Sequence, residues 1–267
     1  MKTRLVEFSN LESQSLRGVL SIPEGEVKGA LLCLHGFERA GTTEKKFKRL
    51  ADALADNKVA TLRFDFSGCG LSDGDFKRTT VERQSEEFVL ALNELKKEVG
   101  DIPVSVATHS MGAAALANKV EQLQDEIHKV ILLAPALNQK NLLRYWFVIG
   151  QMKKQNLDLN VTRNNYRDYL DEDAFMADCQ RTDRMSKTSY ILPEYFLSGQ
   201  SEDYSSRMGP IADKVMQIHG LNDITVPYES NTITFKNVHI EEKGNHDIEK
   251  PDQTDNWVPK AVEFIKK

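Results

Sequence analysis

Cysteine, excess positive charge and long apolar runs are all scarce in this 267-residue chain, and each scarcity excludes a class of protein. The three cysteines, Cys33, Cys69 and Cys179, are too few and too irregularly spaced for a disulfide framework or a cysteine zinc site. A formal net charge of -5 argues against a nucleic-acid partner, because phosphate binding requires clustered lysine and arginine side chains. We therefore expect reduced thiols, no metal site and no nucleic-acid partner.

No part of the sequence is apolar for long enough to span a membrane. The longest apolar stretch, LLRYWFVIG at residues 142–150, falls well short of the roughly 20 residues that a membrane helix needs. The first residues alternate as strands do and lack the apolar core of a signal peptide. With reduced thiols, these features predict a cytoplasmic protein. The basic residues Lys45, Lys46, Lys48 and Arg49 lie on a predicted helix, and we interpret them as a solvated face.

Apolar strands alternate with amphipathic helices along most of the chain. Two short alternating segments, Arg4–Phe8 and Leu16–Ile22, precede this pattern. Continuous apolar strands separated by helices predict an α/β fold with a mostly parallel, doubly wound sheet and helices on both faces. Such strands are expected at residues 29–36, 59–66, 103–110, 129–135 and 214–220, with another near Val238–Glu241 before a closing helix around Val258, Val262 and Ile265.

The helices between these strands can be recognised from their apolar faces. A stripe that includes Leu50 and Leu54 predicts a helix after the first buried strand. Thr79 and Glu82 have the spacing of a capping box, and they predict the start of a helix whose apolar face continues to Gly100.

One interval breaks this rhythm. Between Pro135 and Lys214 lie nearly eighty residues, whereas a βαβ unit takes roughly 30. We interpret the excess as an inserted cap, residues 137–207, on an α/β core formed by residues 1–136 and 208–267. Aromatic side chains of this cap are expected to pack its own small core, and some are candidates for lining a mostly apolar substrate pocket. The candidates are Tyr145, Trp146, Tyr169 and Tyr195.

Polar motifs follow the strands at the edge where parallel sheets place their chemistry. In THSMG, residues 108–112, a buried strand turns into a helix with Ser110 at the corner. Such a corner exposes the serine hydroxyl above the sheet edge and aims the next backbone N–H at whatever the serine attacks. The small residues 112–115 suit a tight turn. Thr108 stands where a glycine is usual, and we expect it to be tolerated, with its hydroxyl able to hydrogen-bond locally.

A serine hydroxyl becomes a nucleophile only when a base takes its proton and a third group orients that base. In this strand order the acid should follow the next-to-last strand and the histidine the last strand. Asp223 in HGLNDITVP and His246 in KGNHD occupy those positions. Asp247 and Glu242 are the competing carboxylates, and Asp247 is expected to point away.

The other polar residues at the strand ends are expected to have structural roles. His109 precedes Ser110 and is interpreted as a residue that packs beside the site or supports its reacting residues, while His35 and His219 should brace loops through hydrogen bonds. Asp65 is expected to anchor its own loop. None of these histidines has the carboxylate spacing of a metal site.

Five motifs in this order, HGF, DFSGCGLSDG, THSMG, HGLNDITVP and KGNHD, resemble the α/β-hydrolase superfamily of serine esterases, lipases and peptidases. The likeness covers the chain from about Arg4, and it is greatest to small bacterial carboxylesterases, to the feruloyl and cinnamoyl esterase group and to monoglyceride-lipase-like enzymes. The resemblance implies the α/β-hydrolase fold. It also implies Ser110 as nucleophile, His246 as general base, Asp223 as its orienting carboxylate, and the backbone N–H groups of Phe37 and Met111 as oxyanion hole.

The sequence therefore predicts a serine hydrolase that cleaves a small-molecule carboxylic ester, such as a short-chain or hydroxycinnamoyl ester, without a metal or cofactor. A thioesterase or a serine aminopeptidase stays open, because such a triad does not choose the leaving group. The acidic stretch DYLDED at residues 168–173 could hold the free amine of a peptide. A non-catalytic binding protein on the same fold is a further alternative.

Overall fold

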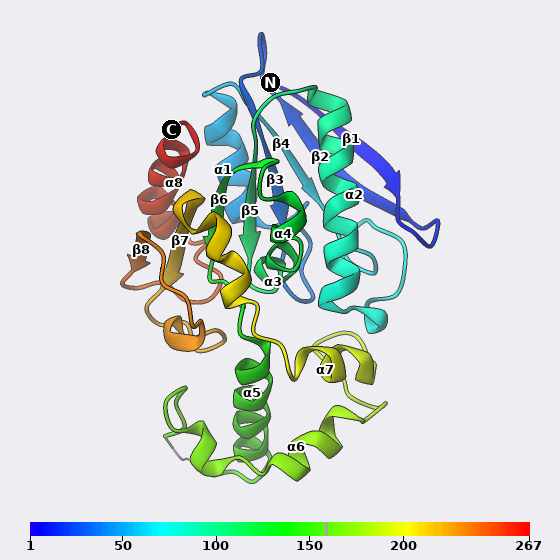
Figure 1. Ribbon diagram of the computed structural model, residues 1–267, viewed down its shortest axis with the longest axis vertical. Coiled ribbons are helices and arrows are strands. Elements are labelled where there is room, and N and C mark those ends of the chain that lie inside the picture. Colours follow the sequence, from blue (N-terminus) through cyan, green and yellow to red (C-terminus); the bar gives the residue numbers. More distant parts are fainter. Residues whose placement is uncertain (158–159) are drawn as a thin grey trace.

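A single sheet of eight strands organises the computed structural model, which describes residues 1–157 and 160–267 (Figure 1). The strand order is β1-β2-β4-β3-β5-β6-β7-β8. The hairpin β1–β2 is antiparallel and joins β4 in antiparallel register, whereas β4, β3, β5, β6, β7 and β8 are parallel, which confirms the predicted sheet. The strands are β1 Lys2–Ser9, β2 Ser15–Ile22, β3 Gly29–Leu34, β4 Val59–Phe64, β5 Val104–His109, β6 Ile127–Leu133, β7 Val215–Gly220 and β8 Asn237–Glu241.

Helices cover both faces of this sheet because its central strands are apolar on both sides. Successive residues of β3 point to opposite faces: Leu31 packs into the cluster under α1 and α8, and Leu32 packs into the cluster under α2 and α3. The two groups of helices lie on opposite sides of the strands (Figure 1). Their bounds are α1 Lys45–Ala55, α2 Val81–Val99, α3 Gly112–Ala117, α4 Val120–Leu123 and α8 Pro251–Ile265.

The start of α2 differs from the prediction by one residue. Thr80, not Thr79, is the N-cap, and its hydroxyl accepts a hydrogen bond from the backbone N–H of Arg83 at 3.1 Å. Thr79 instead follows the short 3-10 helix η1, Phe76–Arg78, and is buried. Because this 3-10 turn delays the helix by one residue, the predicted capping box between Thr79 and Glu82 is wrong.

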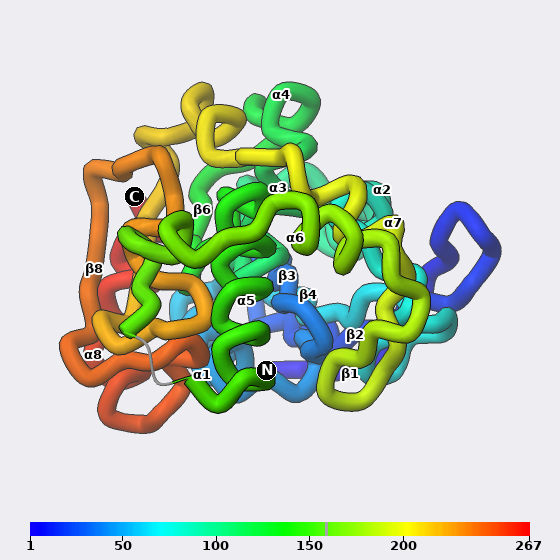
Figure 2. Tube along the Cα trace, turned by 90° about the horizontal axis from the view of Figure 1, so that it is seen from below, coloured from blue at the N-terminus to red at the C-terminus, as the bar shows by residue number. Residues whose placement is uncertain are grey.

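Between β6 and β7 the chain leaves the sheet in what we call the helical excursion, residues 138–204. Its helices project beyond the carboxyl edge of the parallel strands and pass in front of that edge when the molecule is seen from below (Figures 1 and 2). Tyr145, Val148 and Tyr166 form a small apolar cluster of its own. The elements are α5 Gln139–Lys154, η2 Tyr166–Tyr169, α6 Glu172–Cys179 and α7 Pro193–Gly199, and the chain returns to β7 through η3 Ser205–Lys214.

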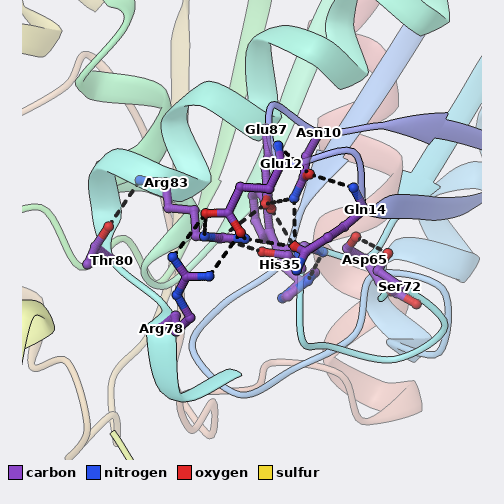
Figure 3. A network of polar contacts seen from close by, with 12 residues as sticks. Asn10, Glu12, Gln14, His35, Asp65, Ser72, Arg78, Thr80, Arg83 and Glu87 are labelled. Atoms are coloured by element: carbon purple, nitrogen blue, oxygen red, sulfur yellow. Dashed lines mark hydrogen bonds and ion pairs between the residues drawn. The ribbon is translucent and has the colours of Figure 1, made fainter. Parts of the chain in front are cut away.

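A polar network ties the turn of the β1–β2 hairpin to α2 and to the loop after β4 (Figure 3). The buried carboxylate of Glu87 accepts hydrogen bonds from the Asn10 amide at 3.2 Å and from the backbone N–H of Ser67 at 2.9 Å. Arg83 reaches from α2 to Glu12 in the hairpin turn at 2.7 Å. The loop after β4 is therefore fixed from two directions.

Two strand-end residues predicted to be structural hold neighbouring loops. The imidazole of His35 accepts a hydrogen bond from the N–H of Phe66 at 2.9 Å, and its other ring nitrogen donates to the carbonyl of Gly36 at 2.8 Å. The carboxylate of Asp65 accepts hydrogen bonds from the backbone N–H groups of Thr42 and Leu71 at 2.9 and 2.8 Å. Both predictions are confirmed.

The three cysteines are buried and free. In residues 1–157 and 160–267, no group of three or more His, Cys, Asp and Glu side chains is arranged to hold a metal ion. Within the same residues, no helix combines the length and apolar character needed to cross a membrane.

Candidate active site

Ser110 occupies the sharp turn between β5 and α3. Its φ of 53° lies in the left-handed region, which is strained for a residue with a side chain. The backbone of Ser110 is held by β6 and the loop after it, because its N–H donates to the carbonyl of Leu133 and its carbonyl accepts from Ala136, both at 3.0 Å. A Cβ at Gly112 would lie 2.5 Å from the carbonyl oxygen of Leu34, so any larger residue at position 112 would displace β3. The turn and its small neighbour are as predicted.

Thr108 does not crowd this turn. It lies within β5, opposite Leu34 and Leu132 of the adjacent strands, where a β-branched residue suits the extended backbone. Its hydroxyl is buried and has no hydrogen-bond partner among the described residues, so the expected local hydrogen bond is not formed.

Two loops at the same edge bring a histidine and a carboxylate to the serine. His246, in the loop after β8, places Nε2 3.0 Å from the Ser110 hydroxyl oxygen. Asp223, in the loop after β7, places Oδ2 2.8 Å from Nδ1 of His246. Gly220 and Gly244 let these loops approach, since a Cβ at Gly220 would overlap the backbone of Gly244. The three residues singled out from the sequence thus form one chain of contacts.

The carboxylate of Asp223 is buried and fully engaged. Its Oδ1 accepts hydrogen bonds from the N–H groups of Thr225 and Val226 at 2.9 and 2.8 Å. Its Oδ2 contacts His246 and also lies 3.3 Å from Nε2 of His219. Burial alone would raise the pKa of Asp223, but the hydrogen bonds from His219 and His246 outweigh it and hold the pKa well below its ordinary value. Asp223 is therefore a fixed negative charge behind His246.

The competing carboxylates do not reach His246. Asp247 points away, as expected, and forms an ion pair with Arg39. Glu242 is exposed to solvent. His219 braces its loop by donating from Nε2 to the carbonyl of Val226 at 2.8 Å, and its second contact, with Asp223, was not anticipated from the sequence.

The two backbone amides expected to form an oxyanion hole flank the serine. Met111 directly follows Ser110, and Phe37 follows Gly36, which is so close that a Cβ there would lie 2.9 Å from the Cβ of Ser110. Neither the N–H of Phe37 nor that of Met111 donates a hydrogen bond within the described part of the chain. The ring of Phe37 packs against Tyr195, with ring centroids 5.0 Å apart. Two backbone donors near Ser110 are thus left without an acceptor in the described residues.

A cluster of buried charged side chains lies next to the site. Lys46 belongs to it, so the prediction that this lysine is solvated is wrong. Lys46 is fully buried, with its ammonium 3.1 Å from Glu44 and 3.7 Å from Glu249. The imidazole of His109 lies 3.3 Å from the same Glu44 carboxylate, and its Nε2 contacts the backbone carbonyl of His246 at 3.1 Å. Burial favours the neutral form of Glu44, but His109 and Lys46 reverse this and hold its pKa well below the ordinary value. His109 is thus buried beside the site and contacts the loop of His246, which agrees with the predicted packing or supporting role.

A cavity of about 570 Å³ opens in front of Ser110 and His246. Residues of the core and of the helical excursion both line it, the latter through Trp146 and Lys187. Of the four aromatic candidates, Trp146 alone is in this lining; its indole N–H also donates to the carbonyl of Thr225 at 2.7 Å. Tyr145 is buried in the cluster of the excursion, Tyr195 is buried against Phe37, and Tyr169 is exposed elsewhere.

Glu38 connects the core side of the cavity to the excursion, a contact that nothing in the sequence pattern signals. Its carboxylate accepts hydrogen bonds from the hydroxyls of Ser186 and Thr188, both at 2.6 Å, and from the N–H groups of Lys187 and Thr188 at 3.2 and 2.8 Å. Partial burial would raise the pKa of Glu38, but these hydrogen bonds lower it. Because Glu38 directly follows Phe37, the excursion is attached beside the unsatisfied amide.

The acidic stretch at residues 168–173 lies away from the cavity. Asp171 caps α6 by accepting from the N–H of Ala174 at 2.9 Å, and Glu172 forms an ion pair with Arg144. No residue of this stretch is in the lining of the cavity in front of Ser110. The suggestion that residues 168–173 bind the free amine of a peptide substrate is therefore not supported at this site.

Comparisons with solved structures agree on the architecture. The Butyrivibrio proteoclasticus protein Est1E, in a structure with bound ferulic acid, is 20% identical with a TM-score of 0.66, covering 98% of this chain and 96% of that one. The α/β-hydrolase GrgF from Penicillium sp. sh18 is 18% identical with a TM-score of 0.70, covering 100% and 98%. The Pyrococcus furiosus esterase Pf2001 is 19% identical with a TM-score of 0.66, covering 99% and 90%. At these identities the likeness establishes the fold.

Sequence comparisons give a shorter match and a long one. An uncharacterized 31.7 kDa Escherichia coli protein, from the traX-finO intergenic region, is 31% identical over 87 residues, which are 32% of this chain and only 30% of that protein. The family model described as "Serine aminopeptidase, S33" matches residues 25–250, which include every strand-end motif discussed above. The chain therefore belongs to this hydrolase family, and its fold is the α/β-hydrolase fold.

Proposed function

We propose that the protein is a serine hydrolase that cleaves carboxylic esters through an acyl-enzyme. The observation that carries the proposal is the chain of contacts from Ser110 to His246 and Asp223, at 3.0 and 2.8 Å. Two backbone amides near Ser110 have no acceptor among the described residues. A hydroxyl, a base, an orienting carboxylate and oxyanion donors are the parts that acyl transfer needs. The residues outside 137–207 supply all of these parts, and residues 137–207 act as a cap over the cavity.

In the first half-reaction Ser110 attacks the ester carbonyl. The hydroxyl proton passes to Nε2 of His246 as the bond from the serine oxygen to carbon forms, and the fixed charge of Asp223 stabilises the imidazolium. The carbonyl oxygen becomes an oxyanion that accepts hydrogen bonds from the N–H groups of Phe37 and Met111. His246 then returns the proton to the departing alkoxide as its bond to carbon breaks.

The second half-reaction releases the acid. A water molecule takes the place of the alcohol, loses a proton to Nε2 of His246 and attacks the acyl carbon. The same amides hold the new oxyanion, and the proton goes back to Ser110 as the acyl bond breaks. Apart from the ester and this water molecule, the steps use groups of this chain.

The charges of the cavity favour an ester over an aminopeptidase substrate, despite the description of the family. An aminopeptidase has to bind the free amine of a peptide, which requires an available carboxylate. The carboxylates that line this cavity are Glu38, which already accepts four hydrogen bonds, and Asp247, which is paired with Arg39. The esterase Pf2001 shares the fold, which supports an ester substrate, and Est1E, with its bound ferulic acid, supports a hydroxycinnamoyl ester. A thioester would fit the same chemistry.

A fluorophosphonate probe and an ester panel test this proposal. The wild-type protein should be labelled at Ser110 and should hydrolyse p-nitrophenyl acetate and a hydroxycinnamate ester faster than amino-acid p-nitroanilides. The Ser110→Ala variant should lose labelling and turnover, whereas Ser201→Ala, at an exposed serine, should keep both. Full turnover by the Ser110→Ala variant would refute the mechanism. A folded, unlabelled wild type without turnover would instead favour a binding protein on this fold.

A further inference from the structure

Four charged side chains line the cavity in front of Ser110: Glu38, Arg39, Lys187 and Asp247. Three of them are engaged by other residues. Arg39 and Asp247 neutralise each other in an ion pair, and Glu38 accepts the four hydrogen bonds from residues 186–188. Glu38 stays an anion, because its four donors are neutral groups, but its oxygen atoms are occupied. Among the described residues, Lys187 is therefore the charged side chain of this lining that is left to contact a ligand.

Lys187 is held in place by its backbone, whereas its side chain is exposed. Its N–H donates to Glu38 at 3.2 Å, and the next N–H, of Thr188, donates to the same carboxylate at 2.8 Å. Its ammonium has no carboxylate within 4.0 Å in the part of the chain that the structure describes. A lysine anchored in this way keeps its stem at the mouth of the cavity, where its charge is available to a ligand.

The remaining lining offers apolar contact rather than further charge. Trp146 is half-buried, and Ile224 is 81% exposed in the loop of Asp223. A ligand that covers Ile224 and Trp146 removes apolar surface from water, which favours binding of an apolar spacer. The cavity thus combines the proposed ester-cleaving centre, apolar side chains and a lysine that forms no ion pair within residues 1–157 and 160–267.

We propose that the preferred substrates are esters that carry a second, anionic group, held by Lys187 while the ester carbonyl lies at Ser110. The proposal rests on the ester hydrolysis proposed above and names its substrate class. The anion is a carboxylate, on either the acyl part or the alcohol part of the ester. A neutral ester of the same shape makes the same apolar contacts but not the charged one.

Matched pairs of substrates isolate the charge. One pair carries it on the alcohol part: 4-acetoxybenzoate against 4-acetoxybenzamide. The other carries it on the acyl part: the monomethyl ester of adipic acid against its terminal amide. For each pair the ratio of kcat/KM, anionic over neutral, is compared between protein variants, so that differences in intrinsic ester reactivity cancel.

The variants are Lys187→Ala and Lys187→Glu, with Lys153→Glu as the matched control on an exposed lysine outside the cavity lining. A single partly exposed ion pair predicts a fall of the ratio by about threefold in Lys187→Ala, and charge reversal predicts a fall of about tenfold in Lys187→Glu. The control should leave the ratio unchanged. The wild-type preference should also shrink between about 20 mM and 500 mM salt, because salt screens an exposed pair.

The outcomes separate this proposal from the one it depends on. The substrate pair that responds identifies the part of the ester that carries the anion, and a response in either pair supports the proposal. Equal ratios in Lys187→Glu and Lys153→Glu for both pairs overturn it, as does a wild type that cleaves p-nitrophenyl acetate but prefers the neutral member of each pair. In both of those cases ester hydrolysis itself stands. Absence of turnover with every ester would instead remove the proposed function.

Discussion

The two walls of the cavity are held in different ways. On the core side, Asp223 is buried and contacts two backbone amides and two imidazoles, and Ser110 is fixed by hydrogen bonds on both sides of its peptide unit. On the excursion side, Trp146 is half-buried and Lys187 is exposed, and each depends on a few polar contacts with the core. The groups proposed to react are therefore much more rigidly placed than the groups proposed to contact substrate.

This difference suggests a division of labour between the walls. Substitutions on the core side should slow the hydrolysis of every ester, because they disturb groups that act in every turnover. Substitutions on the excursion side should change the relative rates of different esters, because their contacts depend on the shape and charge of the substrate. Four predictions test this contrast.

The largest effect is expected from Asp223→Asn. An amide cannot stabilise the imidazolium of His246 and favours the wrong tautomer, so kcat should fall by about 1,000- to 10,000-fold. The loss should be similar for acetate, aryl and anionic esters. Asp213→Asn, at an exposed aspartate paired with Lys236, is the control and should have no effect. A loss of less than tenfold, or one confined to some esters, would break the contrast.

The core wall should also be sensitive to the buried pair beneath it. Lys46→Met leaves the carboxylate of Glu44 buried without its lysine, which should lower the free energy of unfolding by about 3–5 kcal/mol in urea titrations. The double variant Lys46→Met/Glu44→Gln should recover part of this loss. The control is Lys48→Met, which breaks an exposed pair with Asp52 and should cost at most about 1 kcal/mol. Equal losses of unfolding free energy in Lys46→Met and Lys48→Met would contradict the assignment of Lys46 and Glu44 as a buried ion pair.

On the excursion side, Trp146→Ala should discriminate between substrates. Loss of its indole removes apolar contact with a large acyl or aryl group, so kcat/KM for a hydroxycinnamate ester should fall about tenfold. A methyl or ethyl acetate, too small to reach the indole, should be affected less. Tyr169→Ala, another aromatic of the excursion but outside the lining, is the control and should change neither rate. Equal losses for both substrates would mean that Trp146 acts through the core.

The smallest effect concerns pH and the loop of Phe37. Burial lowers the pKa of His35, whose neutral ring accepts the N–H of Phe66. Because the unfolded chain takes up this proton near pH 6.5 and the folded chain does not, the stability that His35 contributes is present above that pH and is lost as the pH falls below it. One proton gives a slope of at most about 1.4 kcal/mol per pH unit. Urea unfolding between pH 7 and 5 should show a steeper decline for wild type than for His35→Asn, and identical slopes would exclude this role.

The sheet and the three residues at its edge were predictable because their signals are local and ordered. Continuous apolar strands that alternate with helices indicate a parallel sheet that is buried on both faces. The motifs around Ser110, Asp223 and His246 each follow a strand of this sheet. The direction of the competing Asp247 followed from its position next to His246. These features depend on spacing along the chain, which the sequence displays.

The features that escaped prediction depend on distant partners. Lys46 lies one turn before Leu50 on the same face of α1, but charge alone suggested solvent, and its partner Glu44 comes from the preceding loop. Lys187 and Glu38 are separated by 149 residues and belong to no periodic pattern. Aromatic content identified the excursion as a possible contributor to the pocket, but only the fold distinguishes Trp146 from Tyr169.

The attachment through Glu38 has a consequence for recombination between related hydrolases. This excursion, moved into another core, would lose the carboxylate that its loop binds unless that core also has one at the position of Glu38. Exchange of residues 138–204 as a single block should therefore yield chimeras whose transplanted loop lacks the hydrogen bonds to Glu38. Including residue 38 in the exchange should restore these hydrogen bonds, so a successful graft has to exchange two segments of the gene that lie far apart.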